Sequence, residues 1–246
     1  MSHLFSEFTL QSPRGPLTLH NRVVVAPMCQ YSANEGQATD WHLMHWGNLL
    51  NSGAAMFFIE ATAVSPKGRI TPTCLGLWDD ATAAALNDKL SRARHLAPKV
   101  PICIQHAHAG RKGSSAAPWH GGQLLDTSHG GWQAEAPSAI PHLEQETPPD
   151  EITAQGLLDI EQDFVKAAQS ADAMGIDAVI TSPGSVDMYS PKVVRATAGS
   201  LWHIPLYSGV TLSTLSEKFP DITKLALSAQ GATSLLELKN VGDCVA

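Results

Sequence analysis

Three apolar runs, each ending in a loop, constrain the fold of this chain most strongly. The runs cover residues 22–26, 55–59 and 100–105, and the first two are followed by helical patterns over residues 41–51 and 80–96. Short apolar runs of this kind are typical of strands buried in a parallel sheet. Their alternation with helices predicts an α/β fold with right-handed crossovers.

The chain on either side of these units continues the pattern. A turn cluster at residues 13–16 predicts a hairpin or cap before the first strand. Residues 148–150 are expected to open another helix, which ends at Gly175 and leads into a fourth strand over residues 176–181. We expect Asp40 to be the N-cap of the first helix.

Composition narrows the class of protein. With 246 residues and 43% hydrophobic content, the chain can bury a sizeable core. The net charge of −7 argues against a dominant nucleic-acid surface, which normally needs a basic stripe. The four cysteines show no CxxC spacing and are expected to be free thiols. No signal peptide or membrane-length apolar run is recognised, so we expect a cytoplasmic protein without membrane partners.

Candidate site residues follow the first and third strands. Cys29 and Tyr31 come just after the first strand, at the end where parallel α/β folds keep their chemistry. His106 and His108 follow the third strand, but two histidines alone do not make a zinc site, and no metal is expected. They can equally be structural histidines beneath residues 107–149, a long segment that we interpret as a lid or an inserted hairpin.

Five ordered motifs resemble the old yellow enzymes, in the branch that has a cysteine near the flavin. The motifs cover residues 21–31, 40–42, 60–64, 68–72 and 105–112, and weaker agreement at residues 136–140 and 162–168 extends the resemblance to about residue 172. The resemblance implies the first half of a (β/α)8 TIM barrel that holds FMN at its carboxyl-terminal mouth. It also implies reduction of activated alkenes with a hydride from NAD(P)H.

The resemblance assigns a role to each matching site residue. Pro27 and Met28 would support the flavin through backbone contacts, and Cys29 would approach its reactive edge and tune its potential. Ala61 and Gln105 would contact the isoalloxazine and its pyrimidine edge. Tyr31 would hydrogen-bond a substrate carbonyl or donate a proton to the substrate.

The carboxyl-terminal part departs from this family. Where a histidine pair is expected after the fourth strand, the chain reads Thr181-Ser182-Pro183-Gly184, and the loops that bind the FMN phosphate are not recognised. Residues 176–187 and 191–206 instead are similar to the middle of the SPOUT RNA ribose methyltransferases, a resemblance that covers about 70 residues and lacks the stretches that form the cofactor knot. We therefore divide the chain into a half-barrel domain at residues 1–172 and a truncated α/β segment at residues 173–246.

Three functions remain open at this stage. The first is an FMN-dependent ene-reductase whose activity is impaired by truncation, acting on a small activated alkene. The second is a non-catalytic flavin-binding or partner-binding remnant, and the third is an RNA methyltransferase fragment. Open strand edges of a half barrel would have to be capped or paired across a homo-oligomer. A gene fusion, a damaged gene or an assembly error would each produce such a junction.

Overall fold

The computed structural model describes most of the chain, namely residues 3–10, 15–97, 99–181, 206–207, 223–224 and 244–245. Its centre is a five-stranded parallel sheet in the order β3-β4-β5-β8-β9. These strands are β3 (Val24–Val25), β4 (Met56–Ala63), β5 (Ile102–Ala107), β8 (Ala178–Thr181) and β9 (Leu206–Tyr207). The predicted parallel α/β fold is confirmed, but the sheet is open and no closed barrel is formed by the described residues.

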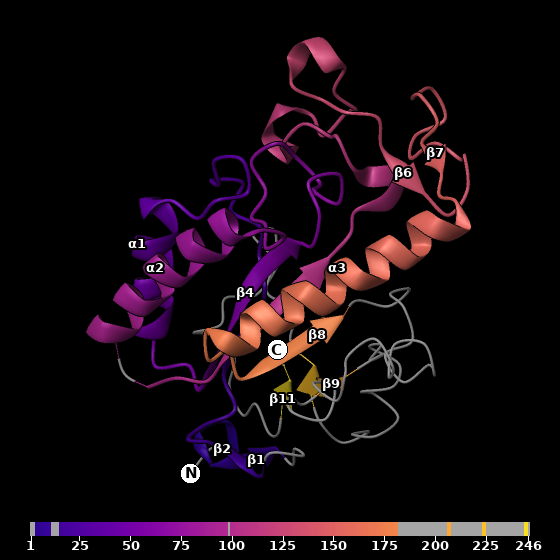
Figure 1. The fold of residues 1–246 in the computed structure, drawn as a ribbon. Coiled ribbons are helices and arrows are strands. Elements are labelled where there is room, and N and C mark those ends of the chain that lie inside the picture. The colour runs from indigo at the N-terminus through magenta and orange to yellow at the C-terminus, as the bar shows by residue number, and fades with distance from the viewer. Residues whose placement is uncertain are drawn as a thin grey trace.

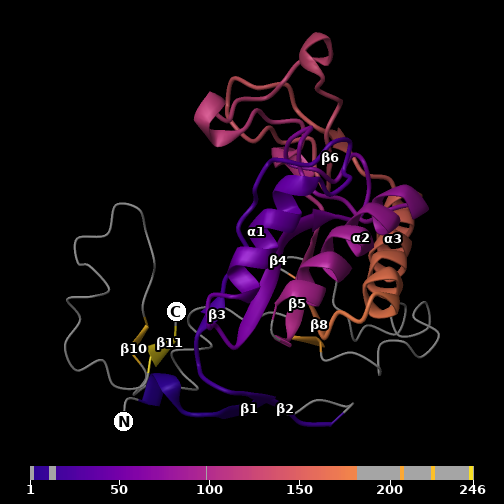
Figure 2. The ribbon, with the colours of Figure 1, turned by 90° about the vertical axis from the view of Figure 1, so that its left-hand side faces the viewer.

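Three helices cover one face of this sheet, as Figure 2 shows. They are α1 (Asp40–Leu50), α2 (Asp80–Leu96) and α3 (Ala154–Ala173). Each helix connects two neighbouring strands, so the chain repeats a strand–helix unit. No helix in the part of the chain that the structure describes has both the length and the apolar character needed to cross a membrane.

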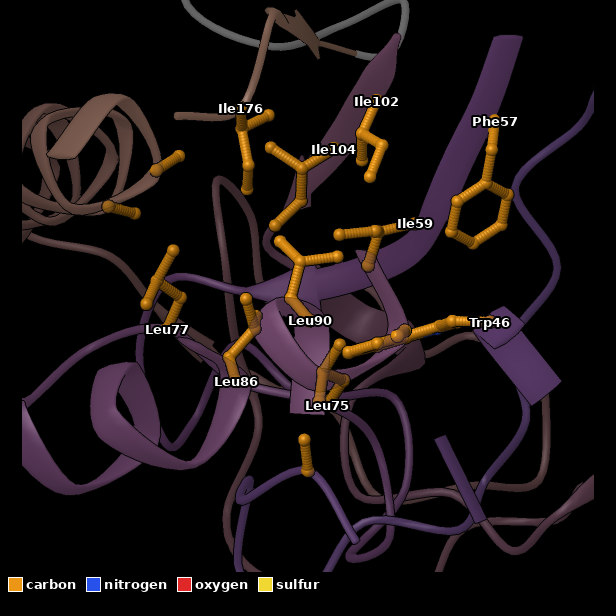
Figure 3. Close-up of a cluster of buried hydrophobic side chains, with 14 of the residues drawn as sticks. Trp46, Phe57, Ile59, Leu75, Leu77, Leu86, Leu90, Ile102, Ile104 and Ile176 are labelled. Carbon is orange, nitrogen blue, oxygen red and sulfur yellow. The ribbon is translucent and has the colours of Figure 1, made fainter. Parts of the chain in front are cut away.

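The main hydrophobic core lies between the sheet and the helices (Figure 3). Alternate residues of β4 and β5 supply one side, including Phe57, Ile59 and Ile104, and Leu86 and Leu90 of α2 supply the other. Side chains on a strand alternate between its two faces, which explains why Met56 and Cys103 belong to a second cluster on the opposite face.

An amino-terminal hairpin covers that second cluster. It follows a 3-10 helix, η1 (His3–Phe5), and pairs β1 (Phe8–Leu10) with β2 (Leu17–Leu19) in antiparallel fashion. Leu19 is buried against the opposite face of the sheet. The predicted hairpin is therefore confirmed, and it lies at the end of the sheet away from the long loop over residues 107–149 (Figure 2).

The long loop contains only short elements and gathers at the carboxyl ends of the strands (Figure 1). These elements are η2 (Gly110–Lys112), η3 (Pro118–His120), η4 (Thr127–His129), β6 (Glu135–Ala136) and β7 (Asp150–Glu151). The pair β6–β7 is parallel, and so is a separate pair of β10 (Thr223–Lys224) and β11 (Cys244–Val245).

Several predicted boundaries were wrong. Residues 150–151 form β7, and α3 begins at Ala154 because the Thr153 side chain accepts a hydrogen bond from the Gly156 N–H at 3.0 Å. The N-cap of α1 is Thr39, not Asp40. The strand β3 is short and only half-buried, because within the described residues it pairs with β4 alone.

Candidate functional site

The turn over residues 27–31 directly follows β3 and is held by hydrogen bonds through Gln30. The Gln30 backbone N–H donates to Glu60 Oε2 at 2.8 Å, and its side-chain amide donates to the Met28 carbonyl at 2.9 Å. The indole N–H of Trp41, on α1, donates to Gln30 Oε1 at 3.2 Å. Strand β4 and helix α1 therefore both fix this turn, in which Tyr31 has a left-handed φ of 50°.

The thiol and the phenol of this turn both stay protonated at neutral pH. Burial raises the pKa of the Cys29 thiol to about 12, and the nearby Cys74 and Glu60 add to this shift. Burial is also the main cause that raises the pKa of Tyr31 to about 12, followed by the proximity of Cys29. A thiol in this state is a poor nucleophile and a poor metal ligand, but it can still take part in hydrogen bonds.

Two further predicted site residues lie side by side on neighbouring strands. The register of β4 and β5 pairs Ala61 with Gln105, after an irregularity between Ile59 and Ala61. Gln105 alternates with Ile104 and so lies on the face of the sheet opposite the helices, together with Cys103. The Gln105 side chain is half-buried, and its amide has no hydrogen-bond partner among the described residues.

The structure brings Cys29 close to this pair. The Ala61 backbone forms a hydrogen bond with the Cys29 thiol that lowers its pKa, opposing the larger effect of burial. The ends of β3, β4 and β5 thus contribute a thiol, a small side chain and an unpaired amide to one edge of the sheet. Met28, in the same turn, is 59% exposed and leaves this edge accessible.

The long loop after β5 reaches over the turn. The ring of Trp119, on η3, contacts Tyr31 edge-on with 5.3 Å between the ring centroids. This contact agrees with the lid or inserted segment that the sequence predicts. Trp119 is itself 64% exposed, so the covering loop is in contact with solvent on its outer side.

An arginine joins this loop to the one after β4. The Arg69 guanidinium lies 5.5 Å from the ring of Trp78 and 4.9 Å from that of Trp132. It also donates hydrogen bonds to the Pro66 and Pro72 carbonyls at 2.9 and 3.0 Å. We call the set of Arg69, Trp78 and Trp132 the arginine clamp.

Sequence reasoning missed a buried pair of residues beneath the turn. Glu60 is 2% exposed and His42 is fully buried, and Glu60 Oε1 lies 3.5 Å from His42 Nε2. Both residues fall within the sequence motifs, and a carboxylate at the end of an apolar strand was the signal that could have singled out Glu60. No group of three or more potential metal ligands is present in the described part of the chain.

The geometry defines the class of this protein, which is an α/β protein with a candidate site at the carboxyl ends of parallel strands. The sequence model of the NADH:flavin oxidoreductase / NADH oxidase family matches residues 4–182. The chain belongs to this family.

Two curated relatives support the assignment. An NADH:flavin oxidoreductase of Gibberella zeae is 39% identical over 176 residues, which make up 70% of this chain and 42% of the relative. An NADPH dehydrogenase of Listeria monocytogenes is 37% identical over 181 residues, or 73% of this chain and 47% of the relative. The chain thus spans less than half the length of these relatives.

The solved structures share the fold. A morphinone reductase has a TM-score of 0.59 at 23% identity and covers 83% of this chain and 61% of its own. An old yellow enzyme of Pichia sp. has a TM-score of 0.63 at 17% identity, covering 83% and 58%. Nothing in these comparisons supports the methyltransferase resemblance, most of which falls on residues 182–205, outside the described part of the chain. The division of the chain at residue 172 stays a prediction.

Proposed function

We propose that this chain binds FMN and takes part in the reduction of activated C=C bonds with NAD(P)H, as an oxidoreductase of the ene-reductase type. The observation that carries the proposal is the pairing of Ala61 with Gln105 at the strand ends, beside Cys29. Family membership supports the flavin, because the family is that of the NADH:flavin oxidoreductases. The chain spans less than half of its longer relatives, so an oxidoreductase activity like theirs is proposed for it here.

The strand-end residues fit an isoalloxazine ring. Such a ring needs amide or backbone hydrogen bonds along its pyrimidine edge and a flat wall of small or apolar groups. The unpaired Gln105 amide offers two donors and an acceptor, and Ala61 leaves room for a ring to approach the sheet. Pro27 and Met28 would add backbone contacts, and the Cys29 thiol would lie against the ring edge.

Tyr31 would act on the substrate. When bound, FMN supplies a ring that accepts a hydride from NAD(P)H and passes it to the alkene. A phenol with a pKa of about 12 keeps its proton at neutral pH and can donate a hydrogen bond to a carbonyl conjugated with the alkene. Trp119 covers Tyr31 and would shield this hydrogen bond from water.

Flavin binding by the full chain tests the first half of the proposal. FMN is titrated into purified protein, and binding is followed by quenching of flavin fluorescence. We expect Gln105→Leu to weaken FMN binding about tenfold or more, because it removes hydrogen bonds each worth about 1 kcal/mol and leaves ring polar groups unpaired. Gln169→Leu is the matched control, since Gln169 is an exposed residue of α3. Equal affinities for Gln105→Leu and the control would overturn this site.

Reduction of the bound flavin tests the second half. We expect NADPH to bleach the flavin absorbance under anaerobic conditions, and 2-cyclohexenone to restore it. A flavin complex that NADPH does not reduce would contradict the proposed activity and leave flavin binding alone. Comparing riboflavin with FMN separates the ring from the phosphate, since equal affinities would mean that the phosphate contributes nothing to binding.

A further inference from the structure

A buried carboxylate lies directly beneath the turn that carries Cys29 and Tyr31. Glu60 is 2% exposed, and its Oε2 accepts the Gln30 backbone N–H at 2.8 Å. A hydrogen bond with an ionised acceptor is stronger than one between neutral groups. Glu60 belongs to β4 and lies at the irregularity between Ile59 and Ala61, so it has no paired residue on β5, while both of its neighbours are paired.

The second oxygen of this carboxylate faces a histidine whose tautomer can be assigned from its contacts. His42 Nδ1 lies 3.0 Å from the Thr39 backbone nitrogen, which can only donate. Nδ1 is therefore the acceptor, and the ring proton is on Nε2. Nε2 lies 3.5 Å from Glu60 Oε1, which is close enough for an electrostatic attraction between the N–H and the carboxylate but longer than an ordinary hydrogen bond.

The buried pair of Glu60 and His42 is expected to reduce the stability of the fold, so a role in holding the turn would explain its presence. Neither Glu60 Oε1 nor His42 Nε2 has a hydrogen-bond partner among the described residues, and burial of such groups destabilises a protein. The one strong bond that Glu60 makes in this part of the chain is the bond to Gln30, which lies between Cys29 and Tyr31. The negative charge also contributes to the raised pKa of both neighbours, after the larger effect of burial.

We propose that Glu60, oriented by His42, is a positioning residue that holds the Gln30 N–H and thereby directs the Cys29 thiol and the Tyr31 phenol toward the flavin and the substrate. The catalytic meaning of this inference rests on the proposed function. The geometric part does not, because it concerns the turn in the protein without flavin.

Alkylation of Cys29 in the flavin-free full chain measures the geometry of the turn. The rate with iodoacetamide is followed by peptide mass mapping, because Cys74 and Cys103 are also present and buried. Glu60→Asp keeps the charge but shortens the side chain by one methylene, so it loses contact with Gln30. Glu60→Gln keeps the length and removes the charge. We expect both variants to raise the Cys29 rate about tenfold, from the loss of a charged hydrogen bond.

Glu135 provides a matched control. Its Oε1 also lies 3.5 Å from a histidine, His108 Nε2, but in the part of the chain that the structure describes Glu135 makes no hydrogen bond or ion pair with residues 27–31, and its side chain is more exposed than that of Glu60. We expect Glu135→Asp and Glu135→Gln to leave the Cys29 rate unchanged. If Glu60→Asp reacts at the wild-type rate while Glu60→Gln reacts faster, charge alone matters and the positioning role is refuted.

Variants of His42 separate positioning from helix capping. Asn places an oxygen where Nδ1 lies and keeps the Thr39 contact, whereas Gln places its amide near Nε2 and loses that contact. We expect His42→Asn to preserve the thermal midpoint of the protein and to raise the Cys29 rate several-fold, since Glu60 loses its orienting N–H. We expect His42→Gln to lower the thermal midpoint and to keep the Cys29 rate closer to wild type. If His42→Asn leaves both the thermal midpoint and the Cys29 rate at their wild-type values, His42 is only a cap and its orienting role is refuted.

The flavin complex gives a readout that a purely structural role would not move. In that complex, Glu60→Gln should raise the reduction potential of FMN relative to Glu60→Asp, because a negative charge beside the ring opposes its reduction to an anion. Equal potentials would contradict a position of Glu60 beside the flavin. If the chain binds no FMN, the proposed function fails, but the alkylation rates still decide the geometric inference.

Discussion

Arg94 provides a test of how the second and third strand–helix units are joined. From the last turn of α2, its Nη1 donates to the Met174 carbonyl at 2.8 Å and its Nη2 to the Gly175 carbonyl at 2.6 Å. The last carbonyls of a helix have no partner within the helix, and a cation there also offsets the negative end of its dipole. Arg94 thus caps α3 just before the chain enters β8.

The expected cost of losing this cap follows from the two bonds. A hydrogen bond to a charged group contributes about 1.5–3 kcal/mol, but Arg94 is half-exposed, and water can replace part of each bond. We therefore expect Arg94→Ala to lower the free energy of unfolding by about 2–3 kcal/mol. For a chain of this length, that loss corresponds to a thermal midpoint about 4–12 °C lower. A lysine at this position cannot reach both carbonyls, so we expect the thermal midpoint of Arg94→Lys to lie between those of the wild type and Arg94→Ala.

Arg92 is the control, since it lies on the same helix and, among the described residues, pairs only with Asp88, at 3.6 Å on the surface. An exposed pair of this kind contributes little to stability, because water and salt screen it. Thermal unfolding, followed through the far-ultraviolet circular dichroism signal of the helices, would compare the thermal midpoints of the variants. A midpoint for Arg94→Ala within about 1 °C of that for Arg92→Ala would refute the capping argument.

Two further predictions concern the core. His106 is buried, neither ring nitrogen has a partner among the described residues, and burial lowers its pKa to about 4. As the pH falls from about 6.5 to 4, the unfolded chain binds a proton that the folded chain does not, so the free energy of unfolding should fall by about 3 kcal/mol. Urea unfolding at several pH values would measure this loss, and we expect the free energy of unfolding of His106→Gln to depend less on pH than that of the wild type. An unchanged dependence on pH would contradict the lowered pKa of His106. Leu90→Ala should cost about 2–5 kcal/mol in the same assay, because Leu90 is fully buried, whereas Leu96→Ala, at a side chain that is 76% exposed, should cost little.

The regular elements could be predicted where local signals agreed. The helix α2 begins where Asp79 caps it, with Asp79 Oδ1 accepting the Thr82 N–H at 2.8 Å. The apolar run at residues 100–105 becomes β5 with both ends shifted by two residues. The N-cap of α1 was wrong by one residue because His42 bonds back to Thr39. A side chain that reaches back in this way competes with the usual preference for Asp.

The apolar pattern of the sequence does not predict the full length of strand β4. The apolar run stops at Ile59, but the strand continues to Ala63 through the pairing with β5. Thr62 is accommodated there because its Oγ1 donates to the Glu60 carbonyl at 2.8 Å. Glu60 is satisfied only in part, since its Oε2 accepts the Gln30 N–H while its Oε1 has no hydrogen-bond partner among the described residues. Long-range pairing of this kind leaves no periodic signal in the sequence.

The site could be predicted only in part. Cys29, Ala61 and Gln105 were found through motifs, and the structure places them at neighbouring strand ends. The contact of Trp119 with Tyr31 could not be foreseen, because it depends on the course of a long loop without periodicity. The role of Glu60 likewise depends on a backbone N–H thirty residues away, which composition does not reveal.

The arginine clamp has a consequence for how molecules enter and leave the site. The Arg69 guanidinium lies over the rings of both Trp78 and Trp132, so one side chain contacts the loop after β4 and the loop after β5. Neither loop can swing outward without separating the cation from one of the two rings, which opposes independent motion of each loop. Outward motion of either loop is therefore coupled to the other through the contact of Arg69 with Trp132.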